Sequence, residues 1–266
     1  MKIKEFKIPY PYNDYLNSIY YFECYDPEHS FFLPDGHPEL MVANRPISVS
    51  ARNKDVVSPN KILFWGQLRF SGHLNASGPY KVCGVKFQPW TLAILSQNHA
   101  INLVDSIIDG RIIFSDLFIE TTKVLAKIDW QCDQQKLMAS KTIGHLFLKE
   151  FRSNIVIKHN FIQTVIFIKK HNGMQSMADL LPEYKQSIRT LGNDFMKYIG
   201  ISPKEYQTII RLRKSSIILK KGYNILHTAL DLGYFDNAHF TKEFKRFSGV
   251  SPKEFSKQKN LVVATV

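Results

Sequence analysis

A row of polar and cationic side chains around residue 240 has the spacing of one helical face. Phe240, Phe244 and Phe247 are four and three residues apart, which is typical of an apolar stripe that faces a core. Early residues of such a helix suit base edges and later cations suit phosphates when the helix lies in a major groove. The opposite face, a candidate contact for double-stranded DNA, carries Asn237, Ala238, His239, Lys242, Lys245 and Arg246.

A second face with similar chemistry lies 49 residues earlier. Leu191 and Phe195 occupy the same apolar positions in this helix as Phe240 and Phe244 occupy in the helix around residue 240. Guanidinium and amide groups one helical turn apart pair well with guanine and adenine edges. For both faces the alternative is a solvated surface, and an early histidine can simply cap or pack. The outward residues of this second face are Arg189, Thr190, Asn193 and Lys197.

The two faces belong to a duplicated unit. The stretch FMKYIGISPKEY (195–206) returns as FKRFSGVSPKEF (244–255), with phenylalanine, glycine and proline in register. Self-similarity at a period of about fifty residues predicts two copies of one supersecondary unit. In the second copy we predict helices at 224–232 and 236–247, joined by a tight turn at Gly233.

Cap signals position the helices of this half. Ser176 with Asp179 has the spacing of a capping box, and Asn224 is a predicted N-cap. Ser202-Pro203 and Ser251-Pro252 each place a cap residue before a proline at the first helical position. Together with the apolar spacing in HNFIQTVIFIKKH, these signals predict an all-helical region that continues to about residue 258.

The positive charge is concentrated in this same half. Residues 1–154 contain 17 Lys/Arg and 15 Asp/Glu, a net charge of +2, whereas residues 155–266 contain 18 and 8, a net charge of +10. Such a concentration favours a polyanionic partner, because counterion release from nucleic acid supplies affinity that is independent of sequence. A solvated basic face without a partner is the alternative.

The first half has a strand pattern followed by a helical one. Apolar and polar residues alternate over 16–25, 39–44, 61–70 and 81–89, and turn sequences separate these runs. From residue 90 onward the apolar spacing becomes helical, at 91–97, 115–128 and 135–151. The pattern therefore predicts that the first half forms an antiparallel, partly closed sheet covered by helices. Those helices could equally form a seam between two copies.

Polar residues near position 37 are candidates for a small-molecule pocket. A turn that enters a strand, with the tryptophans in the core, is the alternative interpretation. Ligand pockets combine apolar walls with a few convergent polar groups. The candidate lining residues are Asp35, His37, Glu39, Trp65 and Trp90.

Metal and enzyme chemistry are not expected. His29, His37, Glu39 and His73 lack the ligand spacing of a metal-binding cupin, so no metal or other cofactor is predicted. No nucleophile lies in a catalytic sequence context, and the Pro-Cys-His-Arg motif of alkyl-accepting domains is absent. The alternative hypothesis is a metal-dependent sensor or enzyme in the first half, tethered to a DNA-binding half.

The string ALDLGYFDNAHFTKEFKRFSGVSPKEF (229–255) resembles the carboxyl-terminal signature of AraC/XylS-type transcription regulators. The match spans about residues 157–257. Along the string, it is carried by a small residue, a glycine followed by an aromatic residue, an aspartate, a phenylalanine, a basic residue, Phe-Lys, a glycine, Ser-Pro and a final aromatic residue. The resemblance implies two helix-turn-helix units joined by a linker helix at 208–222. It also implies that the two recognition helices enter successive major grooves.

The first unit departs from that family pattern. Lys185 stands in the place of the turn glycine, Leu181 in the place of a small residue, and Pro182 lies in the scaffold helix. Gly192 and Asp194 are expected to weaken the recognition helix, since glycine is a poor helix former and a carboxylate repels phosphate. We therefore expect more base reading from the second unit than from the first.

The first half has a fainter resemblance. LPDGHPELMV (33–42), WG (65–66) and GVKFQPW (84–90) look like an uncharacterised domain that precedes such DNA-binding halves, and are distantly similar to the family's β-barrel sensor domains. The resemblance implies a ligand-sensing or dimerising module. A small-molecule effector, RNA polymerase and a second copy of the chain are the partners that it implies beside DNA.

These observations predict a two-domain α+β fold. Residues 1–154 form a β-rich, partly closed antiparallel domain, cupin-like or related, with covering helices, and residues 155–266 form an all-α domain of two helix-turn-helix units. No apolar run reaches the length of a membrane span, and the amino-terminal residues MKIKEFKIPYPYNDYLN are polar and interrupted by prolines. A cytoplasmic location is therefore expected, without a membrane partner.

Overall fold

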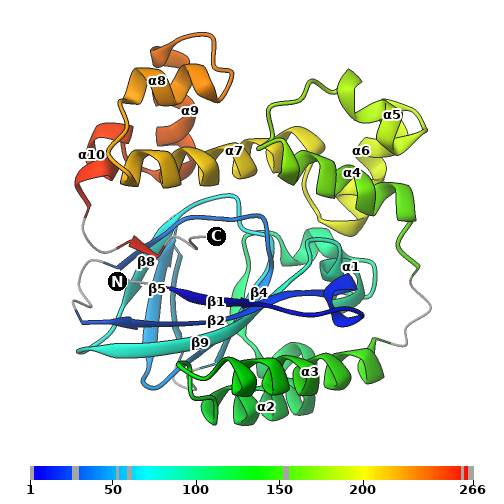
Figure 1. Cartoon of the computed structure of the whole chain (residues 1–266), viewed down its shortest axis with the longest axis vertical. Coiled ribbons are helices and arrows are strands. Elements are labelled where there is room, and N and C mark those ends of the chain that lie inside the picture. Colours follow the sequence, from blue (N-terminus) through cyan, green and yellow to red (C-terminus); the bar gives the residue numbers. More distant parts are fainter. Residues whose placement is uncertain are drawn as a thin grey trace.

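The computed structural model of the chain describes residues 3–25, 30–51, 54–58, 62–151, 156–258 and 261–262. A β-rich half carries a helical half along one side, and two long helices cover its opposite side (Figure 1). Within these described ranges, no helix is both long and apolar enough to cross a membrane. The predicted boundary at 154/155 lies outside the described residues and stays a prediction.

Two antiparallel sheets form the β-rich half. One has the order β1 (Lys4–Lys7), β2 (Leu16–Cys24), β9 (Tyr80–Phe87), β4 (Glu39–Ala43), β7 (Ile62–Trp65) and β10 (Ile107–Asp109). The other has the order β11 (Leu261–Val262), β3 (Ser30–Phe32), β8 (Gly72–Asn75), β5 (Ile47–Ala51) and β6 (Lys54–Ser58). The predicted antiparallel, β-rich fold is confirmed, and β11 adds a short parallel strand beside β3.

Strict alternation along the strands separates an inner core from an outer one. Met41 and Trp65 pack in the core between the sheets, while their neighbours Leu40 and Phe64 pack in the outer core. Because side chains two residues apart share a face, Glu39 lies on the same inner face as Met41. The strand pattern therefore brings a carboxylate into the space between the sheets.

Helices close the outer face of the larger sheet. They are α2 (Arg111–Ala126) and α3 (Asp133–Glu150), with the short α1 (Thr91–Leu95), η1 (Tyr12–Asp14) and η3 (Ala100–Leu103) nearby. Phe118 of α2 and Phe147 of α3 are fully buried against Phe64 and Phe87 of the sheet. The predicted helices at 115–128 and 135–151 thus cover the barrel, which is one of the two roles left open for them.

The helical half holds two units on either side of a long helix. Its elements are α4 (His159–Lys170), η4 (Ala178–Leu180), α5 (Leu181–Tyr184), α6 (Ile188–Tyr198), α7 (Pro203–Lys220), α8 (Ile225–Asp231), α9 (Asn237–Ser248) and α10 (Pro252–Lys257). α7 runs between the unit of α4 to α6 and the unit of α8 to α10 (Figure 1). At about 1.5 Å per residue, its 18 residues span about 27 Å.

The two halves share their cores. Trp90 and Ala93, at α1, belong to the apolar core of the first helical unit. Phe31 and Leu33 belong to the core of the second. Polar contacts add to this packing, because the Ser71 hydroxyl donates to the Ser248 carbonyl at 2.6 Å. The helical half is therefore docked on the barrel at both of its units.

Candidate functional site

The second helix-turn-helix unit has the predicted cap and core. Asn224 caps α8 by accepting from the Leu226 amide at 2.7 Å, and Asp236 caps α9 by accepting from the His239 amide at 2.6 Å. Gly233 has a φ of +71°, the left-handed backbone that a tight turn between two helices requires. The predicted inward stripe is confirmed, since all three of its phenylalanines are buried.

The outward face of α9 is open to solvent. The ring of His239 also packs edge-on against Tyr234, with ring centroids 5.4 Å apart, so this histidine has a packing role as well as an exposed position. The remaining side chains of the face present amide and cationic groups without a protein cover. The exposed residues are Asn237, Ala238, His239, Lys242, Lys245 and Arg246.

The first unit presents a comparable face on α6. Arg189, Asn193 and Lys197 are exposed, while Leu191 and Phe195 are fully buried. Thr190 is half-buried, and its amide and its hydroxyl both contact the hydroxyl of the cap residue Ser187, at 3.1 and 2.9 Å. Thr190 thus belongs to the helix cap, and its side chain is less accessible to a ligand than the side chains of Arg189, Asn193 and Lys197.

The expectation that Asp194 repels phosphate is wrong. Its carboxylate is buried, and it accepts from the Lys158 ammonium at 2.8 Å and from the Tyr184 hydroxyl at 2.6 Å. The reason is positional, because residue 194 lies three residues after the buried Leu191 and so shares its inner face. Asp194 ties α6 to α5 and to the segment before α4.

Two other departures of the first unit are accommodated by the backbone. Lys185 has a φ of +60° at the end of α5, the conformation that the family's turn glycine provides. Pro182 lies in the first turn of α5, where its missing amide hydrogen costs nothing. The scaffold is therefore split into η4 and a single turn of α5. The predicted capping box of Ser176 and Asp179 is confirmed at its start.

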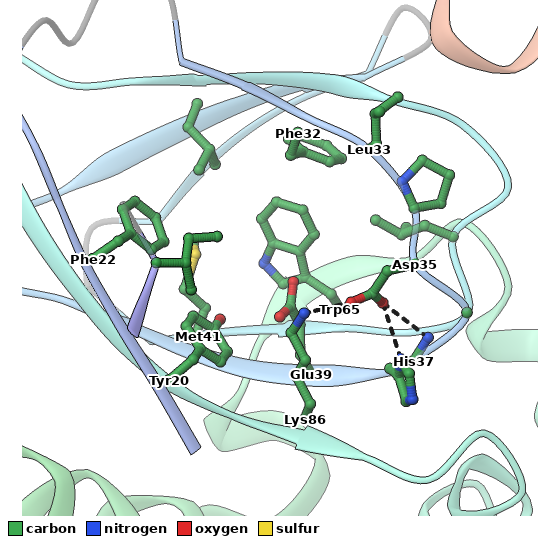
Figure 2. A pocket seen from close by; sticks show the side chains of 15 residues that line it. Tyr20, Phe22, Phe32, Leu33, Asp35, His37, Glu39, Met41, Trp65 and Lys86 are labelled. Carbon is green, nitrogen blue, oxygen red and sulfur yellow. Dashed lines mark hydrogen bonds and ion pairs between the residues drawn. The ribbon is translucent and has the colours of Figure 1, made fainter. Parts of the chain in front are cut away.

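Four of the five predicted ligand residues line one cavity inside the barrel. Asp35, His37, Glu39 and Trp65 surround a space of about 40 Å³, together with Lys86 of β9. Figure 2 shows Glu39 and Lys86 close to Trp65, between Met41 on one side and Asp35 on the other. Apolar side chains, including Phe22, Phe32 and Met41, form most of the remaining wall, to which Tyr20 adds a hydroxyl group.

Trp90, the fifth predicted ligand residue, does not line this cavity, because it follows β9 at the start of α1, outside the barrel. Its indole Nε1 donates to the Asp14 carbonyl at 2.8 Å, and its ring packs into the core of the first helical unit. Trp90 instead borders an open groove of about 880 Å³ between the two halves, which also includes His37, Lys170 and Arg213. Its role as a ligand residue stays a prediction.

A chain of polar contacts links the cavity to the helical half. Lys86 pairs with Asp35, whose carboxylate lies 3.3 Å from Nδ1 of His37. On the other side of the ring, the Lys169 ammonium of α4 lies 3.0 Å from Nε2. Burial, together with the Lys169 charge, lowers the pKa of His37 to about 3. The ring is therefore neutral near pH 7, so Nδ1–H donates to Asp35 and Nε2 accepts from Lys169.

Burial also shifts the other ionisable groups of the cluster. The pKa of Lys169 falls to about 8 through burial and the nearby charge of Arg213. The pKa of Glu39 rises to about 7, because burial disfavours its charged form more than Lys86 favours it. The indole Nε1 of Trp65, which is buried, has no hydrogen-bond partner in the described residues. The cavity thus offers a free donor beside a group that titrates near neutrality.

Sequence reasoning missed Lys86 and Lys169. Lys86 lies four residues after Val82 on β9, so alternation places it on the inner face, and this signal was present in KVCGVKF. Lys169 comes from another half of the chain, so no local pattern relates it to His37. Among the residues described, no three His, Cys, Asp or Glu side chains gather in a geometry that could hold a metal ion.

Comparison with known proteins assigns the helical half. Residues 183–258 match the family described as a helix-turn-helix domain. An uncharacterised HTH-type transcriptional regulator of Haemophilus influenzae is 37% identical over 68 residues, 25% of this chain and 23% of that protein. The HTH-type transcriptional regulator MtrA of Neisseria gonorrhoeae is 38% identical over 65 residues, 24% of this chain and 22% of that protein. The carboxyl-terminal part of the chain is an AraC/XylS-type helix-turn-helix domain.

The match to these relatives covers about a quarter of the chain. The chain spans less than a quarter of the length of either protein. Solved structures extend the likeness to the whole fold. ToxT of Vibrio cholerae has a TM-score of 0.51 at 14% identity, over 90% of this chain and 97% of that one. A ToxT structure with a bound unsaturated fatty acid has a TM-score of 0.52 at 14% sequence identity, over 92% of this chain and 96% of that one. At this identity the likeness shows a shared fold, a β-rich half followed by the AraC-type domain.

Proposed function

We propose that the chain is a sequence-specific, DNA-binding transcription regulator. The observation that carries this proposal is the pair of N-capped helices α6 and α9, each with a buried apolar stripe and an exposed polar face, held by one helix. The net charge of +10 in residues 155–266 adds attraction to a polyanion. The relatives that match the AraC-type domain are named transcriptional regulators, which supports the same class of function.

In this proposal α6 and α9 enter successive major grooves on one side of the duplex. Half-sites of this kind lie about 34 Å apart, so the full site covers about twenty base pairs. Arg189 and Asn193 contact base edges from α6, and Lys197 contacts a phosphate. From α9, the first turn contacts bases through Asn237, Ala238 and His239, and the later cations Lys242, Lys245 and Arg246 contact phosphates.

We further propose that the barrel cavity binds a small effector through Trp65, Glu39, Asp35 and His37. A volume of about 40 Å³ holds on the order of three water molecules. We propose that a larger ligand, such as the unsaturated fatty acid bound by ToxT, displaces the His37–Lys169 contact, because His37 lines the cavity. Since that contact joins the barrel to α4, effector binding would loosen the docking of the AraC-type domain and change its orientation.

The remaining parts of the proposal concern partners and location. RNA polymerase and a second copy of the chain are proposed partners, and the protein is proposed to work in the cytoplasm without catalytic activity. The tethered metal-dependent sensor remains the competing hypothesis. Metal analysis of the purified protein and a comparison of DNA binding with and without a chelator separate this hypothesis from the proposed function. We expect no bound metal and no effect of the chelator on DNA binding.

Selection of bound fragments from a random DNA pool tests the proposed function. The full chain should enrich a site of about twenty base pairs with two conserved elements whose centres lie about one helical turn apart. A variant in which Lys242, Lys245 and Arg246 are all replaced by alanine should enrich the second element poorly. A pool that stays unenriched after several rounds with the wild-type chain would overturn the proposal.

A further inference from the structure

Phe235 is the most exposed large apolar side chain in the part of the chain that the structure describes, at 91%. It lies in the turn between α8 and α9, directly before Asp236, the N-cap of α9. A phenylalanine ring in water is unfavourable, since apolar area removed from water stabilises by about 25 cal/mol per Å². Its exposure at this position therefore calls for a physical explanation.

The fold does not use this ring. A residue directly before an N-cap commonly packs against the fourth residue of the helix, which here is Phe240. Phe240 is fully buried, and Tyr234 packs on it instead, with ring centroids 5.0 Å apart. The Tyr234 hydroxyl donates to Glu243 at 2.6 Å, and the Arg211 guanidinium lies 5.0 Å from its ring. Tyr234 thus takes the inner position and leaves Phe235 outside.

The first unit has a polar residue at the equivalent place. Only Gln186 separates the left-handed Lys185 from the cap residue Ser187, whereas two residues separate Gly233 from Asp236. Counted back from the caps, Gln186 corresponds to Phe235. The second turn is therefore one residue longer, and it presents an aromatic ring where the first presents an amide.

We propose that Phe235 is a specificity-determining residue of the second unit, and that its ring contacts the 5-methyl group of a thymine in the major groove. This inference rests on the proposed function. The amino-terminal end of a recognition helix is the part that meets base edges, and Phe235 lies two residues before the first helical residue of α9. Thymine is the base that shows a methyl group in the major groove, and phenylalanine is one of the side chains that contacts it.

An apolar contact of this kind differs measurably from the phosphate contacts beside it. It changes affinity for one base at one position, and it leaves the salt dependence of binding unchanged because no counterion is released. Removal of one buried methyl group costs about fourfold in affinity, from about 0.8 kcal/mol per buried methylene. Loss of the whole ring costs at least as much.

Deoxyuridine scanning of the selected site tests the inference. Each thymine of the second element is replaced in turn by deoxyuridine, which lacks only the methyl group, and the full chain is titrated by fluorescence anisotropy. At one thymine, wild type should lose about fourfold in affinity. Phe235→Ala should bind the thymine site at least fourfold more weakly than wild type, bind thymine and deoxyuridine equally there, and keep the wild-type salt slope.

Matched variants make the result specific. Phe235→Leu should keep part of the thymine preference, and Gln186→Ala in the first unit should leave it unchanged. The inference is overturned if the second element contains no thymine, if wild type tolerates every replacement, or if Phe235→Ala still prefers thymine. It is also overturned if Phe235→Ala binds the site normally but lowers transcription with RNA polymerase, since the ring would then serve a protein partner. In each of these cases the wild-type chain still selects its DNA site, so the inference about Phe235 fails while the proposed function stands. The proposed function fails only if the wild-type chain selects no site.

Discussion

Replacement of Lys242 by alanine removes one proposed phosphate contact of α9 without disturbing the fold. Lys242 is exposed, and it forms no ion pair within the described ranges of the chain. Its full charge is therefore available to displace a counterion from DNA. Phe240 and Phe244, which anchor the helix on its other side, remain in place.

The expected magnitude follows from counterion release. Each neutralised phosphate contributes about 0.9 to the slope of log affinity against log salt concentration. Lys242→Ala should therefore lower that slope by about 0.9. Between 50 and 200 mM salt, the affinity advantage of wild type over the variant should shrink by about 3.5-fold.

Fluorescence anisotropy with the selected site, at four or more salt concentrations, measures both slopes. Lys141→Ala is the matched control, because Lys141 is also an exposed lysine but lies on α3, on the side of the barrel away from the helical half (Figure 1). We expect the control to reproduce the wild-type slope. Equal slopes for Lys242→Ala and wild type would refute the placement of α9, and an equal drop for Lys141→Ala would show that only general charge is measured.

Three further predictions concern the fold beneath the site. Asp194→Ala should lower the free energy of unfolding by about 2 kcal/mol, because it leaves the buried Tyr184 hydroxyl without its acceptor; an unchanged urea midpoint contradicts this. Gly192→Ala should raise that free energy by up to about 1 kcal/mol, since nothing lies within 4 Å of an added Cβ and alanine is the better helix former; a lower urea midpoint would contradict it. The pKa of His37 is about 3 in the folded chain and 6.5 in the reference state, so the unfolded chain binds the proton first as pH falls. Wild type therefore loses stability as the pH falls from 6.5 to 3, and His37→Gln should lose less stability over this window. Thermal unfolding at a series of pH values measures both losses, and parallel curves of melting temperature against pH for the two proteins would contradict the prediction.

The helices and their caps could be predicted from sequence because the information is local. The Ser-Pro signals predicted Ser202 and Ser251 as cap residues, which is confirmed. The structure adds that each forms a full capping box, with Glu205 and Glu254 respectively. Apolar spacing likewise predicted the buried faces of α6 and α9. These features depend on residues within one or two helical turns of each other.

Other side chains differ from expectation or take their place from distant partners. Asp194 was expected to repel phosphate, but its position three residues after the buried Leu191 turns its carboxylate inward, where Lys158, 36 residues earlier, supplies the opposite charge. Trp90 is of a residue type that often lines pockets, yet the position of its ring depends on a hydrogen bond to the Asp14 carbonyl and on packing against the docked helical half. The strand β11 pairs with β3 from the far end of the chain, and no local pattern predicts that partner.

The candidate site was predicted in part for the same reason. Four residues of the barrel cavity were predicted from their types, as polar groups near position 37 and a tryptophan in a predicted strand. Lys169 completes the polar cluster from α4, and its pairing with the neutral ring of His37 depends on the docking of the two halves. Long-range packing therefore determines the electrostatics of the site, while local sequence determines most of its members.

A change of spacing within the selected site tests the central claim most directly. Five inserted base pairs between the two elements rotate the second element by about half a turn, to the other side of the duplex. Because α7 joins the two units as one continuous helix, α6 and α9 cannot follow that rotation. Binding should fall to the level of a site that retains only one element, whereas unchanged affinity for the lengthened site would contradict paired recognition by the two helices.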